Sequence, residues 1–298
     1  LKRRMGDALK AAGRAASGPA PRRGPTSLTR AAEILADETA ALAAQAPLRS
    51  WPRPQLSPGA RAEHVPVLMY HRVGEDGPAG LARYRISPAK FEAQLRWLRD
   101  NGWQAISSDD VAEGLTRWSG FPEKAVVLTF DDAYCDFGDA AWPLLKRYGF
   151  HAEVFVPTDK VGGMSDWDDV YGPSSPIMDW ARIRALADDG VVFGSHLATH
   201  TAPDGLPTEA LLREAARARA TLEAQLGRTV TSIATPHGAW DERISHTLTL
   251  AGSTTVYTTE PGFVRLGDQP RRLKRIEVRG DVGLDDFVAE LTPHWLKP

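Results

Sequence analysis

The sequence predicts an α/β fold, a distorted barrel of seven strands surrounded by helices. From residue 64 onward, short apolar runs alternate with amphipathic stretches of helical period. Strands separated by helices in this way need right-handed crossovers, which produce a parallel sheet. Seven or eight such units in one chain of 298 residues favour a closed or distorted barrel over an open sheet.

The first element is expected to be a helix outside this repeating pattern. Leu28, Leu35 and Leu42 lie on one face of a helix from Thr29 to Gln45. Four prolines follow within residues 47–58, and they predict an extended linker. The helix therefore precedes the barrel and is joined to it by a stiff segment.

The strands and helices of the barrel are marked by apolar runs, caps and glycines. Strands are expected at Val65–Tyr70, Trp103–Ser107, Ala125–Phe130, Ala152–Val156, Val191–Ser195, Thr231–Ala234, Thr254–Thr258 and Arg275–Val278. The first barrel helix begins after Ser87 with a proline in its first turn, and Gly102 ends it. Further helices are expected at residues 109–117, 138–148, 179–189, 208–226 and 240–251, four of them followed directly by a glycine.

Composition excludes several classes of protein. The chain is 42% hydrophobic and 25% charged, as in globular domains, and its net charge of −2 gives no reason to expect a nucleic-acid partner. The single Cys135 excludes an internal disulfide and a zinc site of several thiolates. We find no apolar run long enough for a transmembrane segment and no signal peptide. The compartment stays open, either cytoplasmic or reached by another export route.

Charge divides the chain into two parts. Residues 1–60 carry ten Lys/Arg against four Asp/Glu, and we expect them to form a basic tail, the first helix and the proline-rich linker. Residues 61–298 carry a net charge of −8 and are expected to form the catalytic domain. The basic tail could make peripheral contact with anionic lipid or with a partner. The alternative is a solvated tail with the helix packed on the domain.

The reactive side chains follow directly after predicted strands. His71 follows the first strand, Asp131 and Asp132 follow Ala125–Phe130, and a Pro236-His237-Gly238 turn follows Thr231–Ala234. His196 and His200 follow Val191–Ser195. Parallel α/β folds build their active sites at the carboxyl ends of their strands, so these residues are expected to meet.

This set of residue types predicts a metal site. His196 and His200 are four residues apart, so on a helical turn both imidazoles would face one ion. Asp131 and Asp132 supply a carboxylate, and two adjacent carboxylates at a strand end are costly unless a cation neutralises one of them. One could ligate while the other serves as a general base. The alternative for the Asp pair is an N-cap of the following helix.

These motifs resemble the polysaccharide deacetylase family, carbohydrate esterase family four. The resemblance rests on Thr129-Phe130-Asp131-Asp132, the His196/His200 pair and the Pro236-His237-Gly238 turn. The opening Val67-Leu68-Met69-Tyr70-His71-Arg72-Val73 resembles the branch that deacetylates poly-N-acetylglucosamine and related exopolysaccharides. It implies a barrel that is circularly permuted relative to the rest of the family.

The resemblance assigns a role to each motif residue. It implies one divalent ion, zinc first, with cobalt, nickel or iron as alternatives, held by Asp132, His196 and His200. Asp131 would accept a proton from the attacking water, and His71 would protonate the departing amine. The backbone N–H of His237 would bind the oxyanion.

Four positions depart from the family pattern. Ala133 stands where glycine is usual, and His237 replaces a tyrosine. Leu197 replaces the hydroxyl residue that follows the first ligand histidine. Ala234 replaces an arginine, and Arg275 on the last strand could supply the missing charge beside Asp131, with an exposed ion pair as its alternative.

The expected function is removal of N-acetyl groups from an N-acetylhexosamine-containing glycan by a metal-dependent hydrolase. Trp167 and Asp168, in a polar loop over residues 162–176, could form one wall of an open glycan cleft, although a core position is the alternative for Trp167. Two other substrates keep the same site, a small cyclic amide or imide and a lipid-linked sugar. A catalytically silent glycan-binding module is the alternative from another class, and retention of the whole residue set argues against it.

Overall fold

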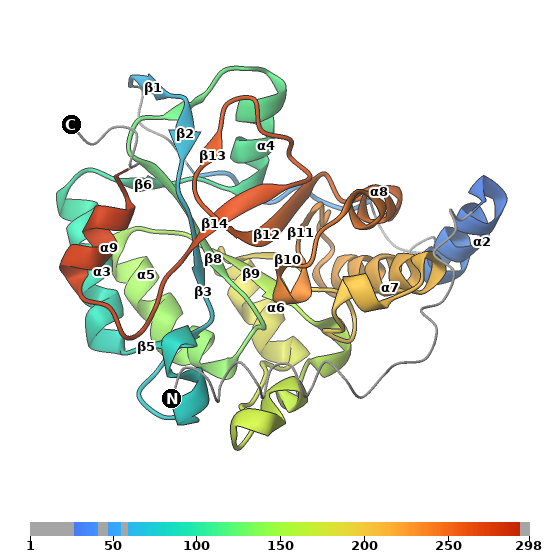
Figure 1. The fold of residues 1–298 in the computed structure, drawn as a ribbon, viewed down its shortest axis with the longest axis horizontal. Coiled ribbons are helices and arrows are strands. Elements are labelled where there is room, and N and C mark those ends of the chain that lie inside the picture. The colour runs from blue at the N-terminus through green and yellow to red at the C-terminus, as the bar shows by residue number, and fades with distance from the viewer. Residues whose placement is uncertain (1–26, 41–46, 55–58, 293–298) are drawn as a thin grey trace, which may run out of the picture.

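The centre of the molecule is a closed barrel of seven parallel strands. A computed structural model describes residues 27–40, 47–54 and 59–292. In ring order the strands are β3 (Val67–Tyr70), β14 (Leu273–Glu277), β12 (Thr255–Pro261), β11 (Ser232–Ala234), β10 (Val192–Ser195), β9 (Glu153–Val156) and β8 (Ala125–Phe130), and β8 pairs with β3 to close the ring (Figure 1). The predicted seven-stranded α/β barrel is confirmed.

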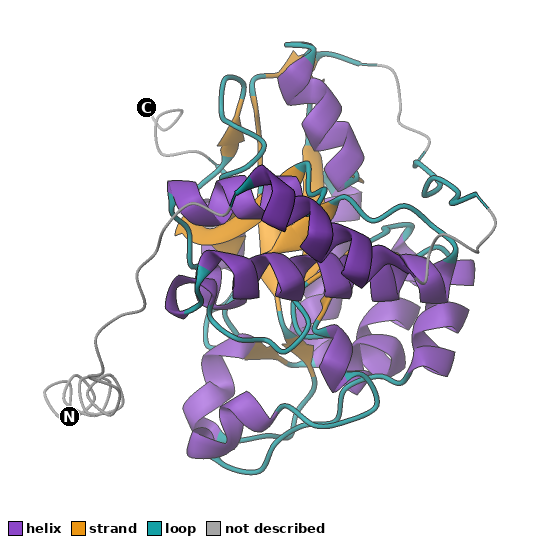
Figure 2. Cartoon of the chain, turned by 90° about the vertical axis from the view of Figure 1, so that its right-hand side faces the viewer, coloured by secondary structure: helices purple, strands orange, loops and turns teal. Residues whose placement is uncertain are grey.

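Helices enclose this barrel, as the view in Figure 2 shows. They are α3 (Pro88–Asp100), α4 (Ser108–Thr116), α5 (Trp142–Tyr148), α6 (Trp180–Asp188), α7 (Thr208–Leu226), α8 (Glu242–Leu250) and α9 (Leu284–Glu290). Helix α2 (Leu28–Thr39) lies outside this layer, against α7 (Figure 1). Among the described residues, no helix combines the length and apolar character needed to span a bilayer. The expected helix bounds hold to within a few residues wherever a cap is visible in the sequence. Ser87, Asp179 and Asp241, for example, each accept a backbone N–H at a helix start.

Several elements differ from expectation. The strand expected at Val65–Tyr70 is divided at Pro66, which has no N–H to donate, into β2 (His64–Val65) and β3. The strand expected at Trp103–Ser107 is only β6 (Gln104–Ala105), because Ser107 instead caps α4. The helix expected at 138–148 is a π-helical segment, η3 (Phe137–Ala141), followed by α5. Helix α9 was not expected.

Short strands and 3₁₀ turns frame the two ends of the barrel. β1 (Arg61–Ala62) pairs with β7 (Phe121–Pro122), β2 pairs with β13 (Val264–Arg265), and β4 (Arg72–Val73) pairs with β5 (Arg85–Ile86). The 3₁₀ turns are η2 (Ala79–Tyr84), η4 (Thr158–Lys160), η5 (Asp166–Tyr171), η6 (Pro203–Gly205) and η7 (Pro236–Gly238).

In the described part of the chain, one apolar cluster joins the barrel interior to α4, and two others lie outside the barrel. Phe155, Tyr257 and Leu273 belong to the inner cluster, which is almost wholly buried. Outside, one cluster lies under α3, α5 and α6, and the other joins α2, α7 and α8. Ala31 and Ile34 of α2 are buried in that last cluster, so the helix before the linker packs on α7 (Figure 1).

The basic tail expected before the first helix, and the lipid contact considered for it, lie outside the described residues. The last residues of the expected first helix, 41–46, lie outside them as well. The described part of the linker runs across the amino-terminal end of the barrel. There Trp51 packs near Phe193 and Arg53 pairs with Glu113.

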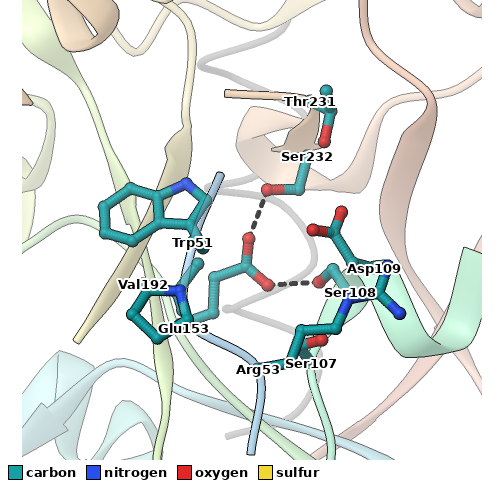
Figure 3. A pocket seen from close by; sticks show the side chains of 10 residues that line it. Trp51, Arg53, Ser107, Ser108, Asp109, Glu153, Val192, Thr231 and Ser232 are labelled. Atoms are coloured by element: carbon teal, nitrogen blue, oxygen red, sulfur yellow. Dashed lines mark hydrogen bonds between the residues drawn. The ribbon is translucent and has the colours of Figure 1, made fainter. Parts of the chain in front are cut away.

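A buried acid occupies this amino-terminal end of the barrel interior. Glu153 accepts hydrogen bonds from Ser108 and Ser232 (Figure 3). Ser108 Oγ also lies 2.8 Å from the Tyr257 hydroxyl. Burial raises the pKa of Glu153 from 4.5 to about 7, although the two serine hydrogen bonds oppose the rise. Glu153 therefore holds its proton in the folded state at a pH where an unfolded chain has lost it.

Glu153 makes stability depend on pH. The pKa of Glu153 is higher in the folded state than in the unfolded state. Its proton therefore contributes fully to the free energy of unfolding below pH 4.5, and this contribution is lost as the pH rises to about 7. We expect the free energy of unfolding of the wild type to fall across this window by about 3 kcal/mol relative to Glu153→Gln, which carries no titrating proton. Urea unfolding of both proteins at pH 4.5 and pH 7.5 measures the difference. Parallel pH profiles would contradict this account.

Candidate metal centre

The predicted ligands meet at the carboxyl end of the barrel strands. Asp132 follows β8, and His196 and His200 follow β10. Their nearest ligand atoms all lie within 4.8 Å of one another, and all three side chains are buried. Asp132 Oδ1 is 3.3 Å from His196 Nε2 and 3.0 Å from His200 Nε2. The structure thus brings together the residues that the sequence proposed.

The polar atoms of this cluster fit a divalent cation. The Nδ1 atom of His196 lies 2.8 Å from the carbonyl oxygen of Ala234, so Nδ1 carries a proton and Nε2, which faces Asp132, is the nitrogen that a metal would use. Asp132 Oδ1 has no hydrogen-bond partner among the described residues, although it is buried. A carboxylate oxygen facing imidazole lone pairs is repelled unless a positive charge lies between them.

Electrostatics in the cluster keep the carboxylate ionised. Burial raises the pKa of Asp132, but His200 and His196 outweigh burial and hold the pKa well below its ordinary value. For His196, burial lowers the pKa, and the neighbouring Asp131 and Asp132 raise it above its ordinary value. The lowered pKa of Asp132 and the raised pKa of His196 both show that this pocket favours positive charge.

The backbone around the ligands is left-handed at residues that are not glycine. Asp132 has φ 73° and Ala133 φ 57°, so the alanine adopts the conformation for which glycine is usual. The helical turn expected for His196 and His200 is wrong. Leu197 has φ 61° and His200 φ 64°, which interrupts any helix and makes this segment a loop. The two imidazoles converge through this bent backbone.

Asp131 makes a buried ion pair with Arg275. The two guanidinium nitrogens Nη1 and Nη2 each lie 2.7 Å from one oxygen of Asp131. Arg275 is 1% exposed and also donates from Nε to the carbonyl of Thr258 at 2.9 Å. The exposed ion pair considered for Arg275 is therefore wrong. Burial raises the pKa of Asp131, but Arg275 outweighs burial and holds the pKa below its ordinary value.

Neither aspartate caps the helix that follows. Its N-cap is Asp136, which makes no side-chain cap hydrogen bond. Asp131 is instead occupied by Arg275, and Asp132 faces the two histidines. The N-cap alternative for the Asp pair is therefore wrong.

His71 and His237 lie at the edge of the same site. His71 is half-buried, its ring centroid is 4.9 Å from that of Tyr84, and it follows Tyr70, whose carbonyl accepts the backbone N–H of Asp131 at 3.0 Å. The ring of His237 is 5.2 Å from the His200 ring, and burial together with His200 lowers the pKa of His237. His237 has φ 58°, so the η7 turn is left-handed at this residue.

Trp167 is partly buried, and it packs both on the edge of the hydrophobic core and against the metal-ligand cluster. Its ring stacks on the His200 ring with centroids 4.0 Å apart, and Tyr134 beside it donates to Asp168 at 2.7 Å. The sequence pointed to Trp167 through its loop, but nothing in the pattern indicated a contact with His200. Glu214 of α7 was not singled out, yet it binds the loop between the two histidines. The sequence indicates Glu214 only weakly, because it shows no more than a carboxylate between buried positions of an amphipathic helix.

Comparison with known proteins gives a family match around this site. The family model for polysaccharide deacetylase matches residues 119–256. That span contains Asp131, Asp132, His196, His200 and His237 but not His71 or Arg275. YxkH of Bacillus subtilis, named as a polysaccharide deacetylase, is 27% identical over 225 residues, 76% of this chain and 75% of that protein. The poly-beta-1,6-N-acetyl-D-glucosamine N-deacetylase of Escherichia coli is 30% identical over 142 residues, 45% of this chain and only 20% of that protein.

Solved structures show the same barrel. The Streptococcus pyogenes deacetylase PplD in complex with acetate matches with a TM-score of 0.68 and 22% identity, over 78% of this chain and 100% of that one. At that identity the likeness concerns the fold. IcaB from Ammonifex degensii matches with a TM-score of 0.64 and 26% identity, over 76% of this chain and 95% of that one.

The buried ion pair predicts a large cost for breaking it. Arg275→Met leaves the Asp131 carboxylate buried without a cation, so we expect the free energy of unfolding to fall by about 3–5 kcal/mol. The double variant with Asp131→Asn should lose less, because no charge is then stranded. Urea unfolding measures both.

Arg272→Met is the matched control for this test. Arg272 pairs with Glu260 at the surface, so its replacement should cost about 1 kcal/mol or less. An Arg275→Met protein as stable as this control would contradict the role of the buried pair.

Proposed function

Because this chain belongs to the polysaccharide deacetylase family, we propose that it removes acetyl groups from N-acetylglucosamine residues of a glycan. One observation carries the proposal. The convergent Asp132, His196 and His200 cluster lies directly beside an ionised, arginine-bound Asp131. That arrangement combines a cation site with a second, ionised carboxylate outside the cluster, the two groups that amide hydrolysis needs at neutral pH.

We assign the cluster to one divalent ion, with zinc as the first choice. One carboxylate and two imidazoles suit zinc in a catalytic site, because they leave further coordination positions open. Cobalt, nickel and iron accept the same donors. A bound ion of this kind supplies Lewis acidity and lowers the pKa of water at the site. The residues that hold it are Asp132, His196 and His200.

Asp131 is the proposed general base. In amide hydrolysis the water oxygen bonds to the acetyl carbon, the bond from that carbon to nitrogen breaks, and acetate and a free amine are released. Arg275 keeps Asp131 ionised, so its carboxylate can accept the proton that water loses. The bidentate contact also fixes the carboxylate plane. Asp131 is thereby kept apart from Asp132, which faces the two histidines.

His71 and His237 complete the proposed reaction. His71 would donate a proton to the leaving nitrogen, because it reaches the site from β3, the neighbour of β8 in the ring. The backbone N–H of His237, on the left-handed η7 turn, would donate to the oxygen that gains negative charge as the water attacks.

The proposed substrate is a β-1,6-linked chain of N-acetylglucosamine. Support comes from the names of the Escherichia coli and staphylococcal relatives. The η5 turn adds Trp167 at the cluster, with Val170 and Tyr171 exposed beside it. Exposed apolar side chains near a site mark a surface for a ligand larger than an acetamide group. A chain of sugars uses such a surface better than a single residue does.

The ligand assignment predicts metal content. We expect the purified wild type to hold close to one equivalent of a divalent ion and His200→Ala to hold much less, because one of three protein ligands is gone. Elemental analysis after dialysis measures this. His246→Ala, an exposed histidine on α8, is the control and should match the wild type. Equal metal in wild type and His200→Ala would contradict the assignment.

The assigned roles predict loss of rate without loss of metal. We expect His71→Ala and Asp131→Asn each to lower the rate of acetate release by about 10²–10⁴, the usual effect of removing an acid or a base. Their metal content should stay near that of the wild type. A His71→Ala enzyme of normal rate would transfer the acid role to His237.

The substrate assignment predicts a dependence on chain length. Acetate release should be faster from longer β-1,6-linked N-acetylglucosamine oligomers than from shorter ones. A length series measured beside β-1,4-linked oligomers, a monocyclic imide and a lipid-linked monosaccharide tests it. Hydrolysis of the imide or the lipid-linked sugar alone would overturn the polymer assignment and leave the metal assignment standing.

A further inference from the structure

The two ligand histidines are oriented in different ways. His196 is fixed through Nδ1, which lies 2.8 Å from the carbonyl oxygen of Ala234. His200 Nδ1 is buried and has no hydrogen-bond partner among the described residues. Metal-binding histidines almost always donate this second N–H to an acceptor that fixes the ring. The direction of His200 must therefore be set by its backbone and by the stacked Trp167.

That backbone is not in a conformation it would adopt unaided. Leu197 and His200 both have positive φ, and each non-glycine residue in this region costs about 1–2 kcal/mol. The loop keeps its shape only if contacts with the rest of the protein outweigh this cost.

A single carboxylate oxygen holds the middle of the loop. Glu214 Oε2 accepts the backbone N–H of Ala198 at 3.2 Å and of Thr199 at 2.9 Å. It also accepts the Thr199 hydroxyl at 3.0 Å. Hydrogen bonds to an ionised acceptor are the stronger kind, and here all three end one residue or two before His200.

Two further residues, Asp159 of η4 and Arg217 of α7, hold the loop and the Glu214 carboxylate in place. Asp159 N–H donates to the carbonyl of Ala198 at 2.8 Å. Arg217 Nη2 bridges Asp159 Oδ2 at 2.8 Å and Glu214 Oε1 at 3.1 Å. These contacts close a ring from α7 through the loop to η4 and back to α7. Leu197, which stands where the family has a hydroxyl residue, is buried in the apolar cluster with α7 and contributes no polar contact from its side chain.

We infer that Glu214 is a positioning residue that aims His200 at the metal through the backbone of Ala198 and Thr199. The inference rests on the proposed metal site. Glu214 does not reach the cluster itself.

Zinc affinity of the full chain, measured by competition with a chromophoric chelator, tests this inference. Glu214→Gln removes the charge and should weaken zinc binding by about 10–100-fold, the usual effect of losing such a support. Glu209→Gln is the matched control on the same helix, since Glu209 is exposed and pairs only with Arg30 among the described residues. It should bind zinc as the wild type does.

A double-mutant cycle separates positioning from general loss of structure. In a His200→Ala background, Glu214→Gln should weaken zinc binding no further, because the side chain it aims is gone. Equal weakening in both backgrounds would overturn the inference, as would an unchanged affinity of Glu214→Gln. Should Glu214→Gln fail to fold, Thr199→Val removes one of the three hydrogen bonds and should weaken binding about fivefold. An unchanged affinity of that variant would equally overturn the inference.

The same data distinguish this inference from the metal site on which it rests. If wild type and His200→Ala bind zinc equally, the metal site is wrong and the inference falls with it. If they differ while Glu214→Gln matches the wild type, only the role of Glu214 is wrong.

Discussion

The ion pair of Arg275 with Asp131 is the interaction on which both the barrel and its site depend. Arg275 starts on β14 and crosses the barrel interior, with its guanidinium about 6 Å from the ring centres of Phe155 and Tyr257. It fills space that a hydrophobic side chain would otherwise occupy, and it ends on a carboxylate at the carboxyl end of β8. A charge buried this deeply is tolerated only when paired. Arg275 can therefore pack inside the barrel only if Asp131 is ionised, and Asp131 stays ionised because Arg275 is there.

A comparison of the buried carboxyl groups at the two ends of the barrel shows how a guanidinium partner changes the pKa. Glu153 at the amino-terminal end is as buried as Asp131, but it accepts hydrogen bonds from the hydroxyls of Ser108 and Ser232, and its pKa is raised. Asp131 at the other end is bound by a guanidinium, and its pKa is lowered. The same burial thus yields a neutral acid at one end and an ionised base at the other. Only the ionised end also carries the cluster of Asp132, His196 and His200.

The sequence predicted the fold class and the ligand set because both depend on position along strands. Asp132 and His196 follow apolar runs, and parallel topology brings such residues to one end of the barrel. The sequence could not predict what depends on backbone bends and on distant side chains. The left-handed φ of His200 replaced the expected helical turn, and the burial of Arg275 followed from packing across the barrel. Helix α9 and the contact of Glu214 likewise arise from tertiary packing, which local propensity does not record.

In this barrel, the presence of a cation partner decides which buried carboxylate is ionised. A neutron crystal structure of the metal-free protein at about pH 5.5 tests it directly, because deuterium on a carboxyl group is then visible. The account predicts a deuteron on the Glu153 carboxyl and none on Asp131. A deuteron on Asp131, or a bare carboxylate at Glu153, would contradict it.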